Sequence, residues 1–101
     1  MGTIVVGYVP KPEGKAALRR AAEEAKLRGS SLVVVNSHRG GREFDRDDAI
    51  ESEAQLEEVR SELRGAGVEH EVRQLVRGMD PAEDLVNVAT EVNAEFIVIG
   101  L

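Results

Sequence analysis

The sequence predicts an α/β protein, in which an open parallel β-sheet carries helices on both faces. Short apolar segments rich in Val and Ile alternate with longer segments whose apolar residues recur at helical spacing. Two of the short segments, residues 32–35 and 96–99, contain apolar residues alone, as expected of strands that are covered on both faces. Helices that connect successive strands favour right-handed crossovers and parallel pairing. At 101 residues, the chain is expected to form a single domain.

Four strands are predicted, at residues 3–9, 31–36, 68–76 and 95–101. The first begins with the apolar run Ile4, Val5 and Val6, and Pro10 ends it. The third differs from the others because charged residues alternate with apolar ones, which suits the edge of a sheet better than its centre. The last is an apolar run, which predicts a buried strand, although its free side would be an apolar edge if no fifth strand followed.

Three helices are predicted, at residues 14–28, 47–64 and 81–93. Gly29 follows the first helix and Asn93 ends the third, at positions that favour residues able to adopt positive φ. Asp80 is predicted to be the N-cap of the third helix, with Pro81 at its first position and Glu83 completing a capping box.

The inward faces of these helices are predicted to be aliphatic, because the chain has one Tyr, two Phe and no Trp. The expected inward residues are Ala17, Leu18, Ala21, Ala22 and Ala25 in the first helix, Ile50, Leu56, Val59 and Leu63 in the second, and Leu85, Val86, Val88, Ala89 and Val92 in the third.

Composition excludes several classes of protein. Hydrophobic residues make up 42% and charged residues 32%, which is ordinary for a globular domain. No apolar run approaches the ~20 residues of a membrane span, and the first strand starts without a signal peptide. The absence of Cys excludes disulfides and thiolate sites, so a cytoplasmic location is expected. The net charge of −6 argues against nucleic-acid binding; residues 43–64 hold nine carboxylates and three arginines, typical of a solvated helix face.

Catalytic and metal sites find little support in the sequence. His38 and His70 lack the spacing of metal ligands, and His70 is expected to be exposed on the alternating strand. No serine lies in a nucleophile-elbow context. The acidic residues at 45, 47 and 48 lack the glycine and glutamate of a calcium loop. We therefore expect a protein that is not an enzyme and holds no metal.

Several segments together carry a family resemblance, namely residues 3–9 (TIVVGYV), the Ala-rich helix that ends in Arg28-Gly29, residues 32–36 (LVVVN), and residues 78–85 (GMDPAEDL) leading into 94–100 (AEFIVIG). In this combination they resemble the universal stress protein family. The resemblance covers the whole chain and implies a flavodoxin-like sheet of strand order 3-2-1-4. In the family a fifth strand and a final helix follow, and the fifth strand often forms a dimer interface. The resemblance therefore implies a domain truncated at its C-terminus, and a homodimer.

Many members of that family bind ATP at the carboxyl ends of strands one and four. The positions that match nucleotide neighbours here are Gly7, Tyr8, Val9, Ser37, Ile99 and Gly100. Gly100 matches the first glycine of the family's phosphate loop, and the later glycines have no counterpart. Val9 stands where ATP-binding members usually carry an Asp, and valine can neither accept a hydrogen bond nor hold a metal. The resemblance thus implies weak or altered binding of ATP.

Cations after the first two predicted strands partly offset the missing carboxylate. Lys11 and Lys15 follow the first strand, and His38, Arg39 and Arg42 follow the second. Both loops are expected at the carboxyl edge of the sheet, where these cations either attract a polyphosphate or are simply solvated. Two functions remain open: a stress-response module that binds an adenine nucleotide, or a stress protein without nucleotide that acts through dimerisation or contact with a partner. Neither involves a nucleic acid or a membrane.

Overall fold

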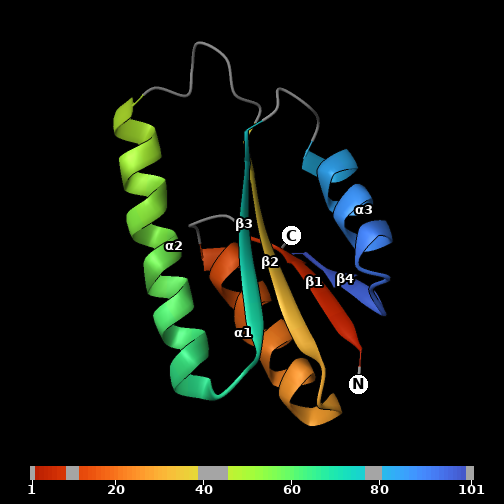
Figure 1. Ribbon diagram of the computed structural model, residues 1–101. Helices are drawn as coiled ribbons and strands as arrows, with labels where there is room; N and C mark the ends of the chain where they lie inside the picture. The colour runs from red at the N-terminus through yellow and green to blue at the C-terminus, as the bar shows by residue number, and fades with distance from the viewer. Residues whose placement is uncertain (1, 9–11, 39–45, 77–80, 100–101) are drawn as a thin grey trace.

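The computed structural model describes residues 2–8, 12–38, 46–76 and 81–99, and it confirms the predicted α/β class (Figure 1). In chain order the elements are β1 (Thr3–Gly7), α1 (Pro12–Arg28), β2 (Ser31–His38), α2 (Arg46–Ala66), β3 (His70–Val76), α3 (Pro81–Glu91) and β4 (Phe96–Val98). The strands of this part of the chain form one parallel sheet of order β3-β2-β1-β4. The predicted order 3-2-1-4 is therefore confirmed.

Strand β1 lies at the centre of the structure. It pairs with β2 on one side and β4 on the other, so that Val5 lies opposite both Val33 and Ile97. Strand β3 pairs with β2 alone among the described residues, with Val72 opposite Val34. The alternating sequence of β3 had predicted this edge position correctly.

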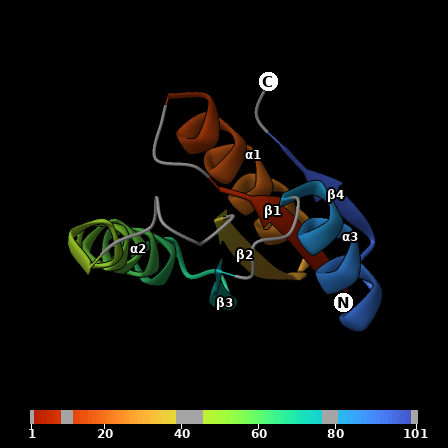
Figure 2. The same ribbon diagram turned by 90° about the horizontal axis from the view of Figure 1, so that it is seen from above.

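The helices form two layers on opposite faces of the sheet. Seen from above, α1 and α2 cover one face and α3 covers the other (Figure 2). On the first face Ile4, Val6, Leu32 and Val34 pack with α1 and α2 in the larger hydrophobic cluster. The smaller cluster joins Val5, Val33, Val35 and Val88 on the α3 face. The period of two along a strand thus sends alternate valines of β1 and β2 into different clusters.

Two helix ends have the backbone geometry that the sequence predicts. Gly29 follows α1 with φ of 65°, and Asn93 lies beyond α3 with φ of 53°. In both cases the chain turns back on the helix: Ser30 N–H donates to the Ala25 carbonyl over 2.9 Å, and Ala94 N–H donates to that of Ala89 over 2.9 Å. These bonds satisfy carbonyls that a helix end would otherwise leave without a partner.

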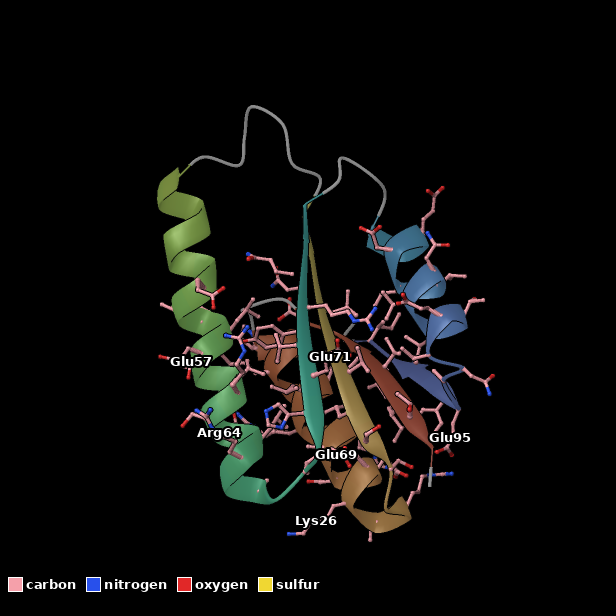
Figure 3. All side chains as sticks on the ribbon, viewed as in Figure 1. Lys26, Glu57, Arg64, Glu69, Glu71 and Glu95 are labelled. Atoms are coloured by element: carbon pink, nitrogen blue, oxygen red, sulfur yellow. The ribbon has the colours of Figure 1, made fainter. Side chains whose placement is uncertain are left out.

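Two carboxylates of α2, Glu53 and Glu57, face outward, as the charge pattern predicts. Arg60 pairs with Glu53 at 2.9 Å and with Glu57 at 3.2 Å, and Arg64 pairs with Glu57 at 3.2 Å. Figure 3 shows Glu57 and Arg64 on the outer side of the helix. Hydrogen bonds from Arg64 and Arg60 lower the pKa of Glu57 below its usual value. Within the described residues, no helix combines the length and apolarity needed to span a bilayer.

Three predictions of burial were wrong. Val86 is 57% exposed, because it lies about 100° around the helix from Leu85 and so falls outside the narrow stripe that contacts the sheet. His70 is half-buried, and its Nδ1 lies 2.8 Å from the Val68 carbonyl oxygen. Ile97 and Ile99 are 38% and 54% exposed, because β4 is an edge strand that only β1 flanks in the described chain. The Asp80 cap and the Ile50 side chain lie outside the described residues.

Candidate functional site at the carboxyl edge of the sheet

Three of the predicted site residues meet at one edge of the sheet. Gly7 is the last residue of β1, Ser37 lies near the end of β2, and Ile99 directly follows β4. In an open parallel sheet this carboxyl edge is where ligands bind. Two further predicted residues, Val9 and Gly100, and the side chain of Ser37 lie outside the described part of the chain.

Gly7 faces α3, and its lack of a side chain allows that helix to approach closely. A Cβ atom added at Gly7 would lie 2.9 Å from Leu85 Cδ1 and 3.5 Å from Ile99 Cγ2. The space next to Gly7 on this face is therefore filled by Leu85 and Ile99. The residue serves the packing of α3 against β1, and any contact with a ligand would have to use its backbone.

Tyr8 points the opposite way, into the layer of α1 and α2. Its side chain is 5% exposed and belongs to the larger hydrophobic cluster, which also contains Leu18 and Val59. Burial raises the pKa of the Tyr8 hydroxyl, and the nearby carboxylates Glu58 and Glu62 raise it further. The predicted site residues are therefore divided between two faces, with Gly7 and Ile99 on the α3 side and Tyr8 on the other.

Asn36 is a site residue that the sequence analysis missed. Its side chain is 4% exposed, and its Nδ2 donates a 3.3 Å hydrogen bond to the Tyr8 carbonyl. Tyr8 N–H in turn donates to the Val35 carbonyl over 2.9 Å, so β1 and β2 remain joined beyond the last strand residue of β1. The signal was present, since Asn36 is the polar residue that ends the apolar run at 32–35.

Tyr8, Asn36 and Gln74 form a polar row across three neighbouring strands. Asn36 lies opposite Gln74 in the register of β2 and β3. Asn36 Oδ1 and Gln74 Nε2 are both buried without a hydrogen-bond partner among the described residues. Buried polar groups are normally hydrogen-bonded, so this row at the carboxyl edge is a place where a water or a bound molecule can complete the bonding.

A larger polar cavity, of about 530 Å³, lies between β3 and α3. Its cation, Arg73, is already bonded to Glu71 at 3.1 Å and to Glu91, and these bonds raise the pKa of Arg73. Asp84, which is 1% exposed on α3, adds a third carboxylate. Three carboxylates line this cavity, and its one cation is already paired. A phosphate group would be repelled by the carboxylates, so the cavity is unsuited to it.

Lys15 is the one cation among those expected at the carboxyl edge whose side chain the structure describes. It is exposed on α1 and lines a small cavity together with Tyr8 and Glu58. The side chains of the others, Lys11, His38, Arg39 and Arg42, lie outside the described residues, so their convergence stays a prediction. Within the described ranges, no three His, Asp or Glu side chains are grouped closely enough to hold a metal ion.

Comparison with known proteins identifies the family. Residues 1–101 match the universal stress protein family along their whole length. The chain belongs to that family. As a universal stress protein it is 39% identical over 98 residues to a universal stress protein of Mycolicibacterium smegmatis, in a match that covers 97% of this chain and 73% of the relative.

Two solved universal stress proteins with nucleotides resemble this one. The protein from Archaeoglobus fulgidus in complex with dAMP is 42% identical with a TM-score of 0.84, and the match covers 98% of this chain and 80% of that one. A universal stress protein in complex with cAMP is 26% identical with a TM-score of 0.76, over 95% of this chain and 69% of that one. Relatives of this protein therefore bind adenine nucleotides.

Proposed function

We propose that this universal stress protein binds an adenine nucleotide such as ATP at the carboxyl edge of its sheet. It would act in the cytoplasm as a stress-response module whose occupancy is the signal, without catalysing a reaction. The observation that carries the proposal is the 42% identity to a universal stress protein solved with dAMP, over 98% of this chain. The complex of a second, more distant relative with cAMP supports the same class of ligand.

The geometry of the edge supports a nucleotide bound through the backbone. Gly7 and Ile99 lie together on the α3 side, and Ser37 lies near the end of the neighbouring strand β2. The base would lie against the segment from Gly7 to Val9 and Ser37, with the phosphates towards Gly100. Val9 supplies no carboxylate for this nucleotide, so we expect weaker binding than an Asp at the same position would give.

Calorimetric titration with ATP, dAMP and cAMP tests this proposal. The wild-type protein should bind weakly, and Val9→Asp should bind roughly ten-fold or more tightly, because hydrogen bonds to charged groups contribute about 1.5–3 kcal/mol. Val86→Asp is the matched control, since it adds the same charge at a 57% exposed position of α3. Absence of binding to every nucleotide, by both wild type and Val9→Asp, would exclude the proposal; tight magnesium-dependent binding by the wild type would exclude the assigned role of Val9.

A second candidate function is self-association, or contact with a partner protein, through β4. Ile97 and Ile99 expose apolar side chains there, and the outer side of β4 is unpaired in the described chain. An apolar edge of this kind is a template for pairing with another strand. Light scattering should detect a homodimer that Ile97→Lys weakens, whereas Leu27→Lys, at an 81% exposed position of α1, should leave it intact. A monomer at all concentrations would exclude self-association by this strand.

A further inference from the structure

A separate polar cavity lies between α1 and α2, on the face of the sheet opposite to α3. Its volume is about 230 Å³, and Tyr8 at the end of β1 lines it. Two cations of α1, Lys15 and Arg19, lie on one side, and two carboxylates of α2, Glu58 and Glu62, lie on the other. The members of each pair are four residues apart, so they project from the same face of their helix.

These four charged side chains form no ion pair with any residue in the described ranges. Outward-facing charges of the same two helices behave differently: Arg20 pairs with Glu24 at 3.2 Å, and Arg60 pairs with Glu53 at 2.9 Å. The cavity thus has a positive wall and a negative wall that do not neutralise each other by contact. Both walls remain available to a molecule that lies between them.

The Tyr8 hydroxyl adds an uncharged hydrogen-bonding group to this cavity. Tyr8 as a whole residue is 5% exposed, but its hydroxyl oxygen is not among the buried polar atoms that lack a partner in the described residues, and it opens into the cavity. Burial first, and then Glu58 and Glu62, raise its pKa, so the hydroxyl keeps its proton at neutral pH. The hydroxyl is therefore available for a hydrogen bond to a molecule in the cavity.

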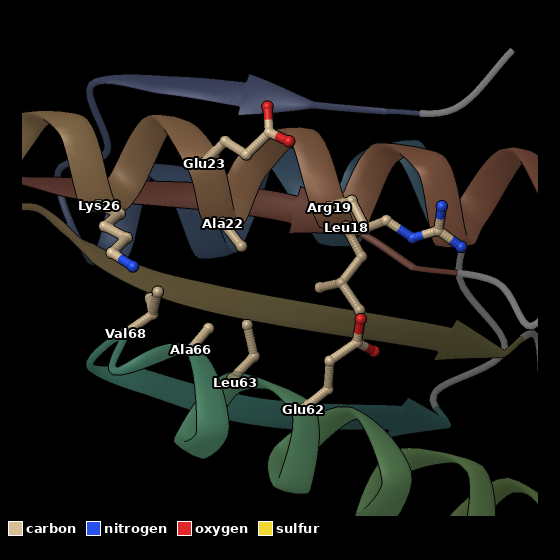
Figure 4. A pocket seen from close by; sticks show the side chains of 9 residues that line it. All are labelled: Leu18, Arg19, Ala22, Glu23, Lys26, Glu62, Leu63, Ala66 and Val68. Carbon is tan, nitrogen blue, oxygen red and sulfur yellow. The ribbon is translucent and has the colours of Figure 1, made fainter.

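An apolar groove continues from the polar cavity along the two helices (Figure 4). The two share the lining residues Leu18, Arg19 and Glu62, and the groove has a volume of about 250 Å³. In Figure 4 the side chains of Arg19 and Glu62 lie at one end of the groove and Lys26 lies towards the other. Between them the groove is lined by small and aliphatic side chains, namely Leu18, Ala22, Leu63, Ala66 and Val68.

We propose that this site binds a small aliphatic α-amino acid, such as leucine, between α1 and α2. The carboxylate of the amino acid contacts Lys15 and Arg19. The ammonium group contacts Glu58 and Glu62 and donates a hydrogen bond to the Tyr8 hydroxyl oxygen. The aliphatic side chain extends into the apolar groove, which removes it from water. Each part of the ligand thereby meets a lining of complementary chemistry.

Charge argues against a nucleotide in this cavity. The four charged lining residues sum to zero, and a phosphate there would face Glu58 and Glu62. The amino-acid site therefore differs from the proposed nucleotide site, which shares Tyr8 with it but extends to the α3 side of β1.

The test is a two-dimensional NMR titration of the isotopically labelled protein with L-leucine. Saturable shifts should appear for residues of α1 and α2 that line the groove. Four analogues separate the contributions: 4-methylpentanoate lacks the ammonium group, 3-methylbutylamine lacks the carboxylate, glycine lacks the side chain, and phosphate reports on a plain anion. Each should bind at least ten-fold more weakly than leucine, because each leaves one wall of the site unpaired.

Variants assign the binding to this site. Tyr8→Phe keeps the volume of the ring and should weaken leucine binding about three- to ten-fold, the value of one hydrogen bond. Glu58→Gln with Glu62→Gln should weaken it more, and these exposed positions are not expected to disturb folding. Arg20→Gln removes a cation from the same helix outside the cavity and should leave the affinity unchanged. ATP titrations of the same variants show whether the nucleotide proposal stands independently.

Each result decides the proposal. Leucine binding that Tyr8→Phe and the double glutamine variant weaken, but Arg20→Gln does not, would support it, whether or not ATP binds. No saturable response up to the solubility limit of leucine would overturn it. Binding that the Tyr8 and glutamate variants leave unchanged would overturn it as well, because the ligand would then lie elsewhere.

Discussion

The Ser30 hydroxyl donates a 2.8 Å hydrogen bond to Oε1 of Glu95, across a separation of 65 residues. Ser30 directly precedes β2, and Glu95 directly precedes β4. Glu95 also lies 3.5 Å from the guanidinium of Arg28, which sits over the ring of Phe96 at 5.1 Å from its centroid. The contact therefore joins the end of α1 to the start of β4 at the amino edge of the sheet.

Replacing Ser30 by Ala should lower the free energy of unfolding by about 1.5 kcal/mol, because it removes a hydrogen bond to a charged group. The loss should be measurable by urea unfolding followed by circular dichroism. Ser61→Ala is the control, since Ser61 is exposed on α2 and should change the stability by less than about 0.5 kcal/mol. Equal stabilities of Ser30→Ala and wild type would show that the bond makes no net contribution.

Gly2→Ala should act through the same contact. A Cβ atom at Gly2 would lie 1.9 Å from Glu95 Oε1, so the carboxylate must move away from Ser30. We expect a loss of about 1 kcal/mol in the wild-type background, and much less when Ser30 is already Ala. A double-mutant cycle measures this coupling, and strictly additive losses would contradict the shared contact.

Gly7→Ala should destabilise the protein by about 1–3 kcal/mol, the usual cost of overpacking. The added methyl group would lie 2.9 Å from Leu85 Cδ1, so α3 must shift away from β1. Gly65→Ala provides a comparison of opposite sign. Gly65 lies in α2, and apart from its own helical backbone and chain neighbours no atom of the described residues lies within 4 Å of an added Cβ, so alanine should stabilise the protein by about 0.5–1 kcal/mol. Thermal unfolding of both variants tests the pair.

Tyr8 should titrate above the ordinary tyrosine value of about 10 in the folded protein. It is the single Tyr of a chain without Trp, so the ultraviolet absorbance of tyrosinate reports on this hydroxyl alone. The midpoint should lie higher in buffer than in concentrated urea, where burial no longer raises the pKa. A folded-state midpoint at or below the urea value would contradict the buried position of the hydroxyl.

The same shift fixes the sign of a pH effect on stability. Because the pKa of Tyr8 is higher in the folded state, its contribution is complete below about pH 10 and is lost as the pH rises towards the folded-state value. The free energy of unfolding, measured in urea, should therefore decrease between pH 9 and 11. The decrease should be smaller for Tyr8→Phe than for the wild type. The part that both proteins share belongs to other groups, such as lysines.

The fold could be predicted because its signals are local. The alternating sequence of β3 placed it at an edge, and Gly29 and Asn93 marked two helix ends that have positive φ in the structure. Val86 was assigned to the buried face of α3 because it is apolar and lies next to the row of apolar residues that contacts the sheet. The sequence does not distinguish a residue beside that row from one within it. Its 57% exposure follows from where α3 contacts the sheet, which is a tertiary property.

The candidate site could be predicted only as far as its strands. The predicted parallel order of the strands was enough to put Gly7, Ser37 and Ile99 at the same edge of the sheet. The role of Gly7 depends on the position of Leu85 in α3, 78 residues later in the chain, which no local pattern encodes. The division of Tyr8 from Gly7 does follow from the period of two along β1, because Tyr8 continues the face of Ile4 and Val6.

Strand β1 supplies residues to both hydrophobic clusters, with Ile4 and Val6 in one and Val5 in the other. The layer of α1 and α2 and the layer of α3 therefore share a single backbone segment as their common support. If β1 leaves the sheet, both layers lose their partner at the same moment, so neither can melt while the other persists. We expect the domain to unfold in one cooperative transition, with the same midpoint for probes placed on α2 and on α3.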